Sequence, residues 1–375
     1  MDNKKIIFIY RKNSKDKMQW SGTVDKLYTQ LKRFYEVEDL QIRESIIEKI
    51  KRKINRYMDN VFIEEDFSIK LIQKTEKNFI KKNLQGLSFQ FWETPNLDNT
   101  DSIIFQDLCV DVVLDLKKNN KELFNKTEFA NFSENDMIKR CEYQKKMYEE
   151  CKLIFTMGKW LKNYICDNYN IAPNKIYSVG GGINIDISKY SSASRTRNKI
   201  LFVGKNFERK GGPLVVESFK ILREKYINNV ELYIVGPYEN KFGNIEGINF
   251  IGNISSDELV YYYNICDIFC MPSYFEAYGL VFGEALCFGL PCIGRKCYAM
   301  PEFIKNGING YLIENDDIED LAYKMYCLIN DDNIHEYVNE MRNNYVQKYS
   351  WNHVGEKIHT IIDEKIGENS EKVTY

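Results

Sequence analysis

Short apolar runs alternate with longer segments of helical periodicity along the first half of the chain. The runs are rich in β-branched and aromatic residues, which is typical of buried parallel strands, and they span residues 4–10, 35–40, 88–92, 102–108 and 151–157. Helical patterns lie between them, at residues 22–34, 42–58, 68–83 and 133–150. This alternation predicts an open, doubly wound α/β sheet.

The pattern loosens around residues 170–198 and then begins again. The loosened segment contains Pro173, three consecutive glycines and a polar stretch, so we place an inter-domain linker at residues 179–198. Beyond it, strands are predicted at 199–204, 230–236, 247–253, 266–273 and 290–295, and helices at 214–226, 280–289 and 318–330. The sequence therefore predicts two α/β domains, residues 1–178 and 199–349. Their strands should end at a central cleft, where ligands of such folds bind.

Composition and charge exclude several classes of protein. With 44% hydrophobic residues but only 21 Gly and 7 Pro in 375 residues, the chain is neither disordered nor collagen-like. Its 52 basic and 54 acidic residues nearly cancel, so no nucleic-acid partner is expected. The 10 cysteines contain no C-x-x-C pair and are interpreted as buried apolar residues in a reducing compartment. No apolar run has the length of a signal peptide core or a membrane span, which predicts a cytoplasmic protein.

The segment MPSYFEAYGLVFGEALCFG holds two carboxylates around a predicted helix start. Glu276 lies in the loop, Gly279 and Leu280 lie at the start, and Glu284 lies in the first turns. Free amides at a helix N-terminus can receive a diphosphate, and a carboxylate one turn further along can accept hydrogen bonds from ribose hydroxyls. The alternative is that both are solvated charges. Against it, Glu284 stands among apolar residues, where an ionised group without a partner is costly.

A second cluster of charge follows the first strand of the second half. In ILFVGKNFERKGG the strand ends at Gly204, and Lys205, Arg209 and Lys210 crowd the next loop. Cations at the carboxyl end of a strand, beside glycines that allow close backbone approach, can form a phosphate clamp. The alternative is an ordinary solvated basic loop.

These segments resemble the retaining glycosyltransferases of family 4. EAYGLVFGE resembles the E-x7-E signature of that family, and FVGKNFERKGG resembles its phosphate segment. LPCIGRKCYAMPEFIKNGINGYLI and YSWNHVGEKI match the segments that follow. The resemblance is dense from about residue 151 to 360. It implies the α/β GT-B fold, with two Rossmann-like doubly wound domains facing a central cleft and a C-terminal helix, about 350–367, that packs back on the N-terminal domain.

The resemblance also implies roles for the residues singled out above. Glu284 would bind the donor ribose and Glu276 the transferred sugar. Lys205 and Lys210, beside Arg209, would neutralise the diphosphate, and the backbone at Gly279 and Leu280 would meet the phosphate end. Lys205 departs from the family, in which Arg is commoner at this position, so the contact would lose the bidentate fork of a guanidinium.

The expected activity is transfer of a hexose-type sugar from a nucleotide-diphosphate donor to a glycan or glycolipid acceptor, with retention, in surface polysaccharide or glycolipid synthesis. The leaving diphosphate would itself take the acceptor proton. No D-x-D follows an apolar strand, so neither a metal nor another cofactor is expected. The alternatives are another GT-B enzyme, such as a nucleotide-sugar epimerase, or a non-catalytic scaffold of the same fold.

The first half offers fewer candidates. Gly22 and Thr23 lie where the family has a glycine-rich loop, and their backbone could meet phosphate or acceptor. Asp107, at the end of a predicted strand, is a candidate polar group near the acceptor, and the alternative is that it caps the following helix. All three histidines lie in the C-terminal portion, so a histidine base is not expected.

Two predicted helices of the first half, residues 44–58 and 68–82, carry many lysines and arginines. Such helices can lie on an anionic membrane, as an acceptor on a lipid carrier would require. This predicts peripheral contact with the inner face of the cell membrane. The alternative is that each helix packs an apolar stripe on the sheet and exposes a basic face to water.

Overall fold

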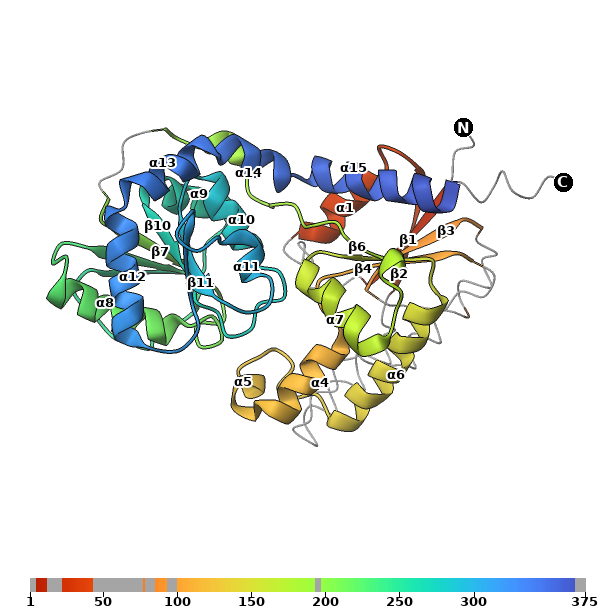
Figure 1. Cartoon of the computed structure of the whole chain (residues 1–375), viewed down its shortest axis with the longest axis horizontal. Helices are drawn as coiled ribbons and strands as arrows, with labels where there is room; N and C mark the ends of the chain where they lie inside the picture. The colour runs from red at the N-terminus through yellow and green to blue at the C-terminus, as the bar shows by residue number, and fades with distance from the viewer. Residues whose placement is uncertain are drawn as a thin grey trace. The chain divides into compact units, whose positions relative to one another are not determined.

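A computed structural model describes residues 5–11, 22–42, 77, 85–92, 100–192 and 197–367. The chain divides into two compact units, whose elements are labelled in Figure 1. Unit 1 takes the described residues within 1–181 and 351–375, and unit 2 takes those within 182–350. The segment 179–198, predicted as a linker, is thus divided at Gly181, and most of it belongs to unit 2.

Unit 1 is built on a six-stranded sheet in the order β2-β1-β3-β4-β5-β6, in which every pairing is parallel. Its strands are β1 (Lys5–Arg11), β2 (Glu36–Ile42), β3 (Leu87–Phe91), β4 (Ser102–Gln106), β5 (Leu153–Thr156) and β6 (Ile176–Ser178). Consecutive residues such as Ile103, Ile104 and Phe105 are all buried because both faces of a parallel sheet are covered. All five predicted strands are present. β6 is too short to have been recognised from its sequence.

Helices flank this sheet, and the last helix of the described chain joins the first. Among the described residues, the α-helices of unit 1 are α1 (Thr23–Leu31), α4 (Val110–Asn119), α5 (Lys121–Asn125), α6 (Glu134–Glu150), α7 (Lys159–Tyr169) and α15 (Trp351–Ile362). α15 packs beside α1 (Figure 1). There the Tyr35 hydroxyl lies 2.8 Å from His359 Nδ1, and the Phe34 ring stacks on the same imidazole. Apart from Lys77, which is helical and exposed, the predicted helices 42–58 and 68–83, and with them the basic helices, lie outside the described residues.

Unit 2 has a second parallel sheet, in the order β12-β11-β10-β7-β8-β9. Its strands are β7 (Lys199–Val203), β8 (Glu231–Val235), β9 (Ile248–Gly252), β10 (Ile268–Cys270), β11 (Cys292–Arg295) and β12 (Gly310–Ile313). The chain runs outward from β7 to β9 and then returns to begin again at β10. β7 and β10 are therefore neighbours at the topological switch point, where sheets of this kind bind ligands beyond the carboxyl ends of their strands.

The helices of unit 2 are α8 (Gly212–Lys225), α9 (Ser256–Ile265), α10 (Leu280–Cys287), α11 (Met300–Phe303), α12 (Ile318–Asn330), α13 (Asp332–Glu340) and α14 (Arg342–Lys348). Two of them, α9 and α12, begin at side-chain caps that can be recognised in the sequence. α12 matches its predicted range, and the Asp317 side chain caps it by accepting hydrogen bonds from the amides of Glu319 and Asp320. α9 was not predicted, although Ser255 and Glu258 form a capping box at its start.

The ten cysteines are all free thiols, and six of them are buried. Within the described ranges, no cluster of three or more His, Cys, Asp or Glu side chains could hold a metal ion. In the same residues, no helix has the length and apolar character needed to cross a membrane.

Candidate functional site

The loops that follow β7 and β10 meet at the switch point of unit 2. Gly211, at the end of the first loop, has φ +78°, and a Cβ there would lie 2.5 Å from the carbonyl oxygen of Pro272 in the second. The amide of Tyr274 donates a hydrogen bond of 2.9 Å to the carbonyl oxygen of Arg209. Because the two backbones touch, the basic side chains of one loop lie beside the carboxylate of the other.

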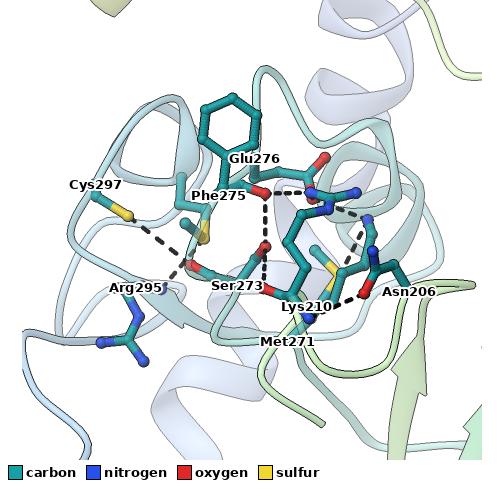
Figure 2. Close-up of polar contacts among 10 residues, drawn as sticks. Asn206, Lys210, Met271, Ser273, Phe275, Glu276, Arg295 and Cys297 are labelled. Atoms are coloured by element: carbon teal, nitrogen blue, oxygen red, sulfur yellow. Dashed lines mark hydrogen bonds and ion pairs between the residues drawn. The ribbon is translucent and has the colours of Figure 1, made fainter. Parts of the chain in front are cut away.

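Lys210 and Glu276 form an ion pair at this junction (Figure 2). Lys210 Nζ donates to Glu276 Oε2 over 2.8 Å, and only 14% and 12% of the two side chains are exposed. Burial would raise the pKa of Glu276. The charges of Lys210 and Arg209, with hydrogen bonds from Lys210 and Ser273, outweigh burial and lower that pKa. Glu276 is therefore ionised at neutral pH.

Arg209 is the second cation of the site. Its guanidinium donates to the carbonyl oxygen of Phe275 and lies 3.8 Å from Glu276 Oε2. The Asn206 side chain accepts a hydrogen bond from the Arg209 amide and so fixes the turn that carries both cations. A carboxylate and two cations with little exposure to water form a strongly polar site, in which electrostatic interactions are stronger than at an open surface.

Glu284 is buried in α10, the helix that follows the loop of Glu276. The Tyr263 hydroxyl donates to Glu284 Oε2 over 3.1 Å, and the backbone amide of Asn184 lies 3.5 Å from Oε1. Burial raises the pKa of Glu284, and these two hydrogen bonds and the charge of Lys210 oppose the rise only in part. Lys210 thus acts electrostatically on both carboxylates. Lys210 pairs with Glu276, and Glu284 lies in the helix that begins four residues after Glu276.

The N-terminus of α10 lies between the two carboxylates in the sequence. α10 begins at Leu280, and Gly279 precedes it with φ +90°. The first amides of a helix have no partner within the helix and carry the positive end of its dipole. A phosphate placed here would meet these amides on one side and the cations of the β7 loop on the other.

We expect Gly279→Ala to weaken donor binding as well as folding. A Cβ at residue 279 would lie 3.0 Å from the Phe282 ring and 3.1 Å from Glu276 Cγ, and left-handed backbone costs a residue with a Cβ about 1–2 kcal/mol. Gly243→Ala is the matched control, because Gly243 has φ +73° and open space where its Cβ would lie. Urea denaturation should show a loss of unfolding free energy in both variants, and the larger loss in Gly279→Ala, where the Cβ is also crowded. Titration with a nucleotide sugar should show weaker binding only in Gly279→Ala, and equal affinity would separate Gly279 from the site.

Other predicted site residues lie elsewhere. Lys205 is exposed, and among the described residues no hydrogen bond or ion pair joins it to Glu276 or Glu284. Gly22, with φ +89°, and the buried Thr23 begin α1 in unit 1. Asp107 also belongs to unit 1, where it follows β4 and is half-buried. Cys109 is the N-cap of α4, its side chain makes no capping hydrogen bond, and the first amide of the helix, that of Val110, donates to Gln144 Oε1 over 2.9 Å.

Three residues of the site were missed in the sequence. Tyr263 lies in a run of three tyrosines, and only the fold shows that the third one points at Glu284. The Ser273 hydroxyl donates to the carbonyl oxygen of Phe275 over 3.0 Å, which closes the turn before Glu276. Arg295, at the end of β11, contacts the same turn. Tyr263 and Arg295 lie 21 and 23 residues from their partners, which hides them from any local pattern. Ser273 lies only two residues before Phe275, so its signal was local.

Comparisons with known proteins find glycosyltransferases among the proteins that this chain resembles. Residues 185–348 match the family described as glycosyl transferases group 1. An uncharacterized glycosyltransferase of Methanocaldococcus jannaschii is 25% identical over 233 residues, which is 56% of this chain and 59% of that protein. The match thus spans little more than half the length of this curated relative.

Solved structures extend the likeness to both units. The chain resembles WaaG, a glycosyltransferase involved in lipopolysaccharide biosynthesis, with a TM-score of 0.65 and 16% identity, covering 96% of this chain and 100% of that one. It also resembles the Anabaena protein HepE, solved with UDP and glucose, with a TM-score of 0.64 and 11% identity over 96% of this chain and 100% of that one. The chain therefore has the GT-B fold, and its residues 185–348 match the family described as glycosyl transferases group 1.

Proposed function

We propose that the protein is a retaining glycosyltransferase that moves a hexose from a nucleoside-diphosphate sugar to an acceptor hydroxyl. The observation that carries the proposal is the placement of Lys210, Glu276 and Glu284 around the N-terminus of α10 at the switch point of unit 2. The match of residues 185–348 to the family of glycosyl transferases group 1 supports the same proposal.

Each group of the site has a task in that reaction. Glu284 accepts hydrogen bonds from the ribose hydroxyls, the amides at Gly279 and Leu280 meet the diphosphate, and Glu276 contacts the sugar. Lys210 and Arg209 stabilise the charge that grows on the diphosphate as it leaves. In the free protein Lys210 is paired with Glu276, so the donor phosphate has to share or replace this contact when it binds.

The reaction exchanges one glycosidic bond for another. The bond between the anomeric carbon and the diphosphate oxygen breaks through an oxocarbenium-like transition state, and the acceptor oxygen bonds to that carbon on the same face. The acceptor proton passes to the departing diphosphate, which is why the site needs no histidine base. Retention and this proton route rest on the resemblance to family 4.

The acceptor belongs to unit 1 in this proposal. We propose a glycan or glycolipid acceptor, with Asp107 as a polar group near its hydroxyl and the backbone at Gly22 and Thr23 close to phosphate or acceptor. Peripheral contact of the basic segments 44–58 and 68–82 with an anionic membrane would bring a lipid-linked acceptor within reach. Neither a metal nor another cofactor is part of the mechanism.

We expect a nucleoside-diphosphate sugar to raise the melting temperature of the purified protein. A ligand at a hundred times its Kd adds about 2.7 kcal/mol to the unfolding free energy. UDP-glucose is the first probe, because HepE was solved with UDP and glucose. GDP-, ADP- and dTDP-linked hexoses follow, with free glucose as the negative control.

The stabilising donor is then incubated with and without glycan or glycolipid acceptors. Acceptor-dependent release of the nucleoside diphosphate, with a first product of the same anomeric configuration as the donor by NMR, would support the proposal. Conversion of the donor sugar without acceptor would point to an epimerase. If no nucleotide sugar changes the melting temperature, the proposed function is wrong.

A further inference from the structure

The loop that carries Glu276 is bordered on its far side by the last residue of β11 and the residues that follow it. This loop, residues 272–279, is named the Glu276 loop. Arg295 Nε donates to the carbonyl oxygen of Pro272 over 3.4 Å, and Cys297 Sγ lies 3.9 Å from the carbonyl oxygen of Ser273 (Figure 2). The Tyr298 ring meets the Phe275 ring edge-on, with centroids 5.1 Å apart. The two loops thus run against each other along the first half of the Glu276 loop.

Arg295 makes three different contacts at once. Besides the Pro272 carbonyl, its guanidinium lies over the Tyr274 ring, 4.3 Å from the centroid, and donates to Asp316 Oδ1 over 2.6 Å. Its side chain is only 11% exposed, so its charge has lost most of its contact with water. A planar guanidinium can stack on a ring with its face while its N–H groups bond in the plane, which an ammonium group cannot do. The residue type therefore fits the contacts.

These contacts complete a clamp on the Glu276 loop. From the β7 side, the carbonyl oxygen of Arg209 accepts from the Tyr274 amide, and the Arg209 guanidinium donates to the Phe275 carbonyl. From the β11 side, Arg295 holds the Pro272 carbonyl and the Tyr274 ring. Glu276 follows within two residues of Tyr274. The direction of the Glu276 carboxylate thus depends on the contacts from both sides of the loop. Only the β7 side, through Arg209, also supplies a cation to the site.

We propose that Arg295 is a positioning residue, which sets the orientation of Glu276 toward the donor sugar without touching the donor. This inference rests on the proposed function. Because Arg295 acts on the loop of Glu276 and not on Glu284 or Lys210, its loss should affect recognition of the sugar and spare recognition of the nucleoside diphosphate. A residue that only stabilises the fold would affect both alike or neither.

The test compares Arg295→Gln and Arg295→Lys with the wild type. Binding is measured by calorimetry with UDP and UDP-glucose. Transfer is measured with the acceptor that the experiment under Proposed function identifies. If a donor other than UDP-glucose stabilises the protein, that donor and its nucleoside diphosphate are used instead. A displacement of catalytic groups on the order of 1 Å lowers turnover about a hundredfold. We therefore expect Arg295→Gln to lose about that factor in kcat and to bind UDP-glucose more weakly, with unchanged affinity for UDP. Arg295→Lys keeps the charge but not the stacked plane, and should fall between.

Arg223 provides a matched control. Its guanidinium also donates to a backbone carbonyl, that of Val230, and pairs with a carboxylate, that of Glu246, each over 2.7 Å, but it lies away from the Glu276 loop. Arg223→Gln should lower the unfolding free energy without changing the affinity for UDP-glucose relative to that for UDP. Equal loss of UDP and UDP-glucose binding in Arg295→Gln, or unchanged kcat and binding, would overturn the inference. If the wild type binds no nucleotide sugar, the proposed function fails first and the inference fails with it.

Discussion

Replacing Lys210 by alanine is expected to lower the rate of sugar transfer by about a hundredfold to a thousandfold, the usual cost of removing one group that stabilises developing negative charge. Lys210 is the cation that lies 2.8 Å from Glu276 and acts on Glu284 as well, whereas Arg209 lies 3.8 Å from Glu276. Single-turnover transfer at saturating donor measures the effect on the chemical step. Lys220→Ala is the control, since Lys220 lies exposed on α8 and pairs only locally with Glu217.

The double variant Lys210→Ala, Glu276→Gln measures how much of the lost stability comes from the unpaired carboxylate. Lys210→Ala alone leaves the poorly exposed carboxylate of Glu276 with Arg209 at 3.8 Å, so some unfolding free energy is lost. Making residue 276 neutral removes that penalty, and the double variant should regain stability in urea denaturation without regaining transfer. Wild-type turnover in Lys210→Ala would remove this residue from the mechanism. Recovery of transfer in the double variant would show that the single variant was merely misfolded.

The second large effect is expected from Glu284→Gln, which should weaken donor binding without weakening the fold. Hydrogen bonds to a charged group contribute about 1.5–3 kcal/mol, so the loss of the charge should raise the donor Kd roughly ten- to a hundredfold. Kd for the nucleotide sugar and for the nucleoside diphosphate should rise together, because Glu284 is assigned to the ribose that both contain. Calorimetric titration of both ligands measures this.

The stability of this variant should depend on pH in a defined direction. Burial raises the pKa of Glu284 above 4.5, so the folded chain holds the proton of this carboxyl more tightly than the unfolded chain. The contribution of Glu284 to stability therefore falls as pH rises from the unfolded pKa to the folded one. A glutamine does not ionise, so Glu284→Gln does not lose this stability as pH rises. The variant should be at least as stable as the wild type in urea denaturation at pH 7. A variant that unfolds more easily at pH 7 but binds donor normally would make Glu284 a structural residue.

Much of unit 2 could be predicted because its signals are local. A buried strand and the helix after it are recognised within a few residues, as in β10 followed by α10, and Glu284 attracts attention because an unpaired charge in an apolar helix is costly. Helices without a clear apolar stripe, such as α9, were missed. The helices predicted between residues 42 and 83 lie outside the described residues, except for Lys77.

The composition of the site was harder to predict than its location. Lys205, Arg209 and Lys210 are equally basic in the sequence, but the turn after β7 directs only the last two toward Glu276. The partners Tyr263 and Arg295 come from α9 and β11, and they reach the site only because α9 packs near α10 and β11 lies next to β10. Such pairings follow from strand order, which no local pattern contains.

The path of the chain through unit 1 has a consequence for biosynthesis. α1 is made near the beginning, but α15, which buries Trp351, Val354 and Ile358 and packs against it, is translated only after all of unit 2. While the ribosome is still synthesising unit 2, the side of α1 that α15 will cover is exposed to water. The nascent N-terminal unit must therefore wait, incompletely folded, for its closing helix, whereas unit 2 is continuous and can fold as soon as it emerges.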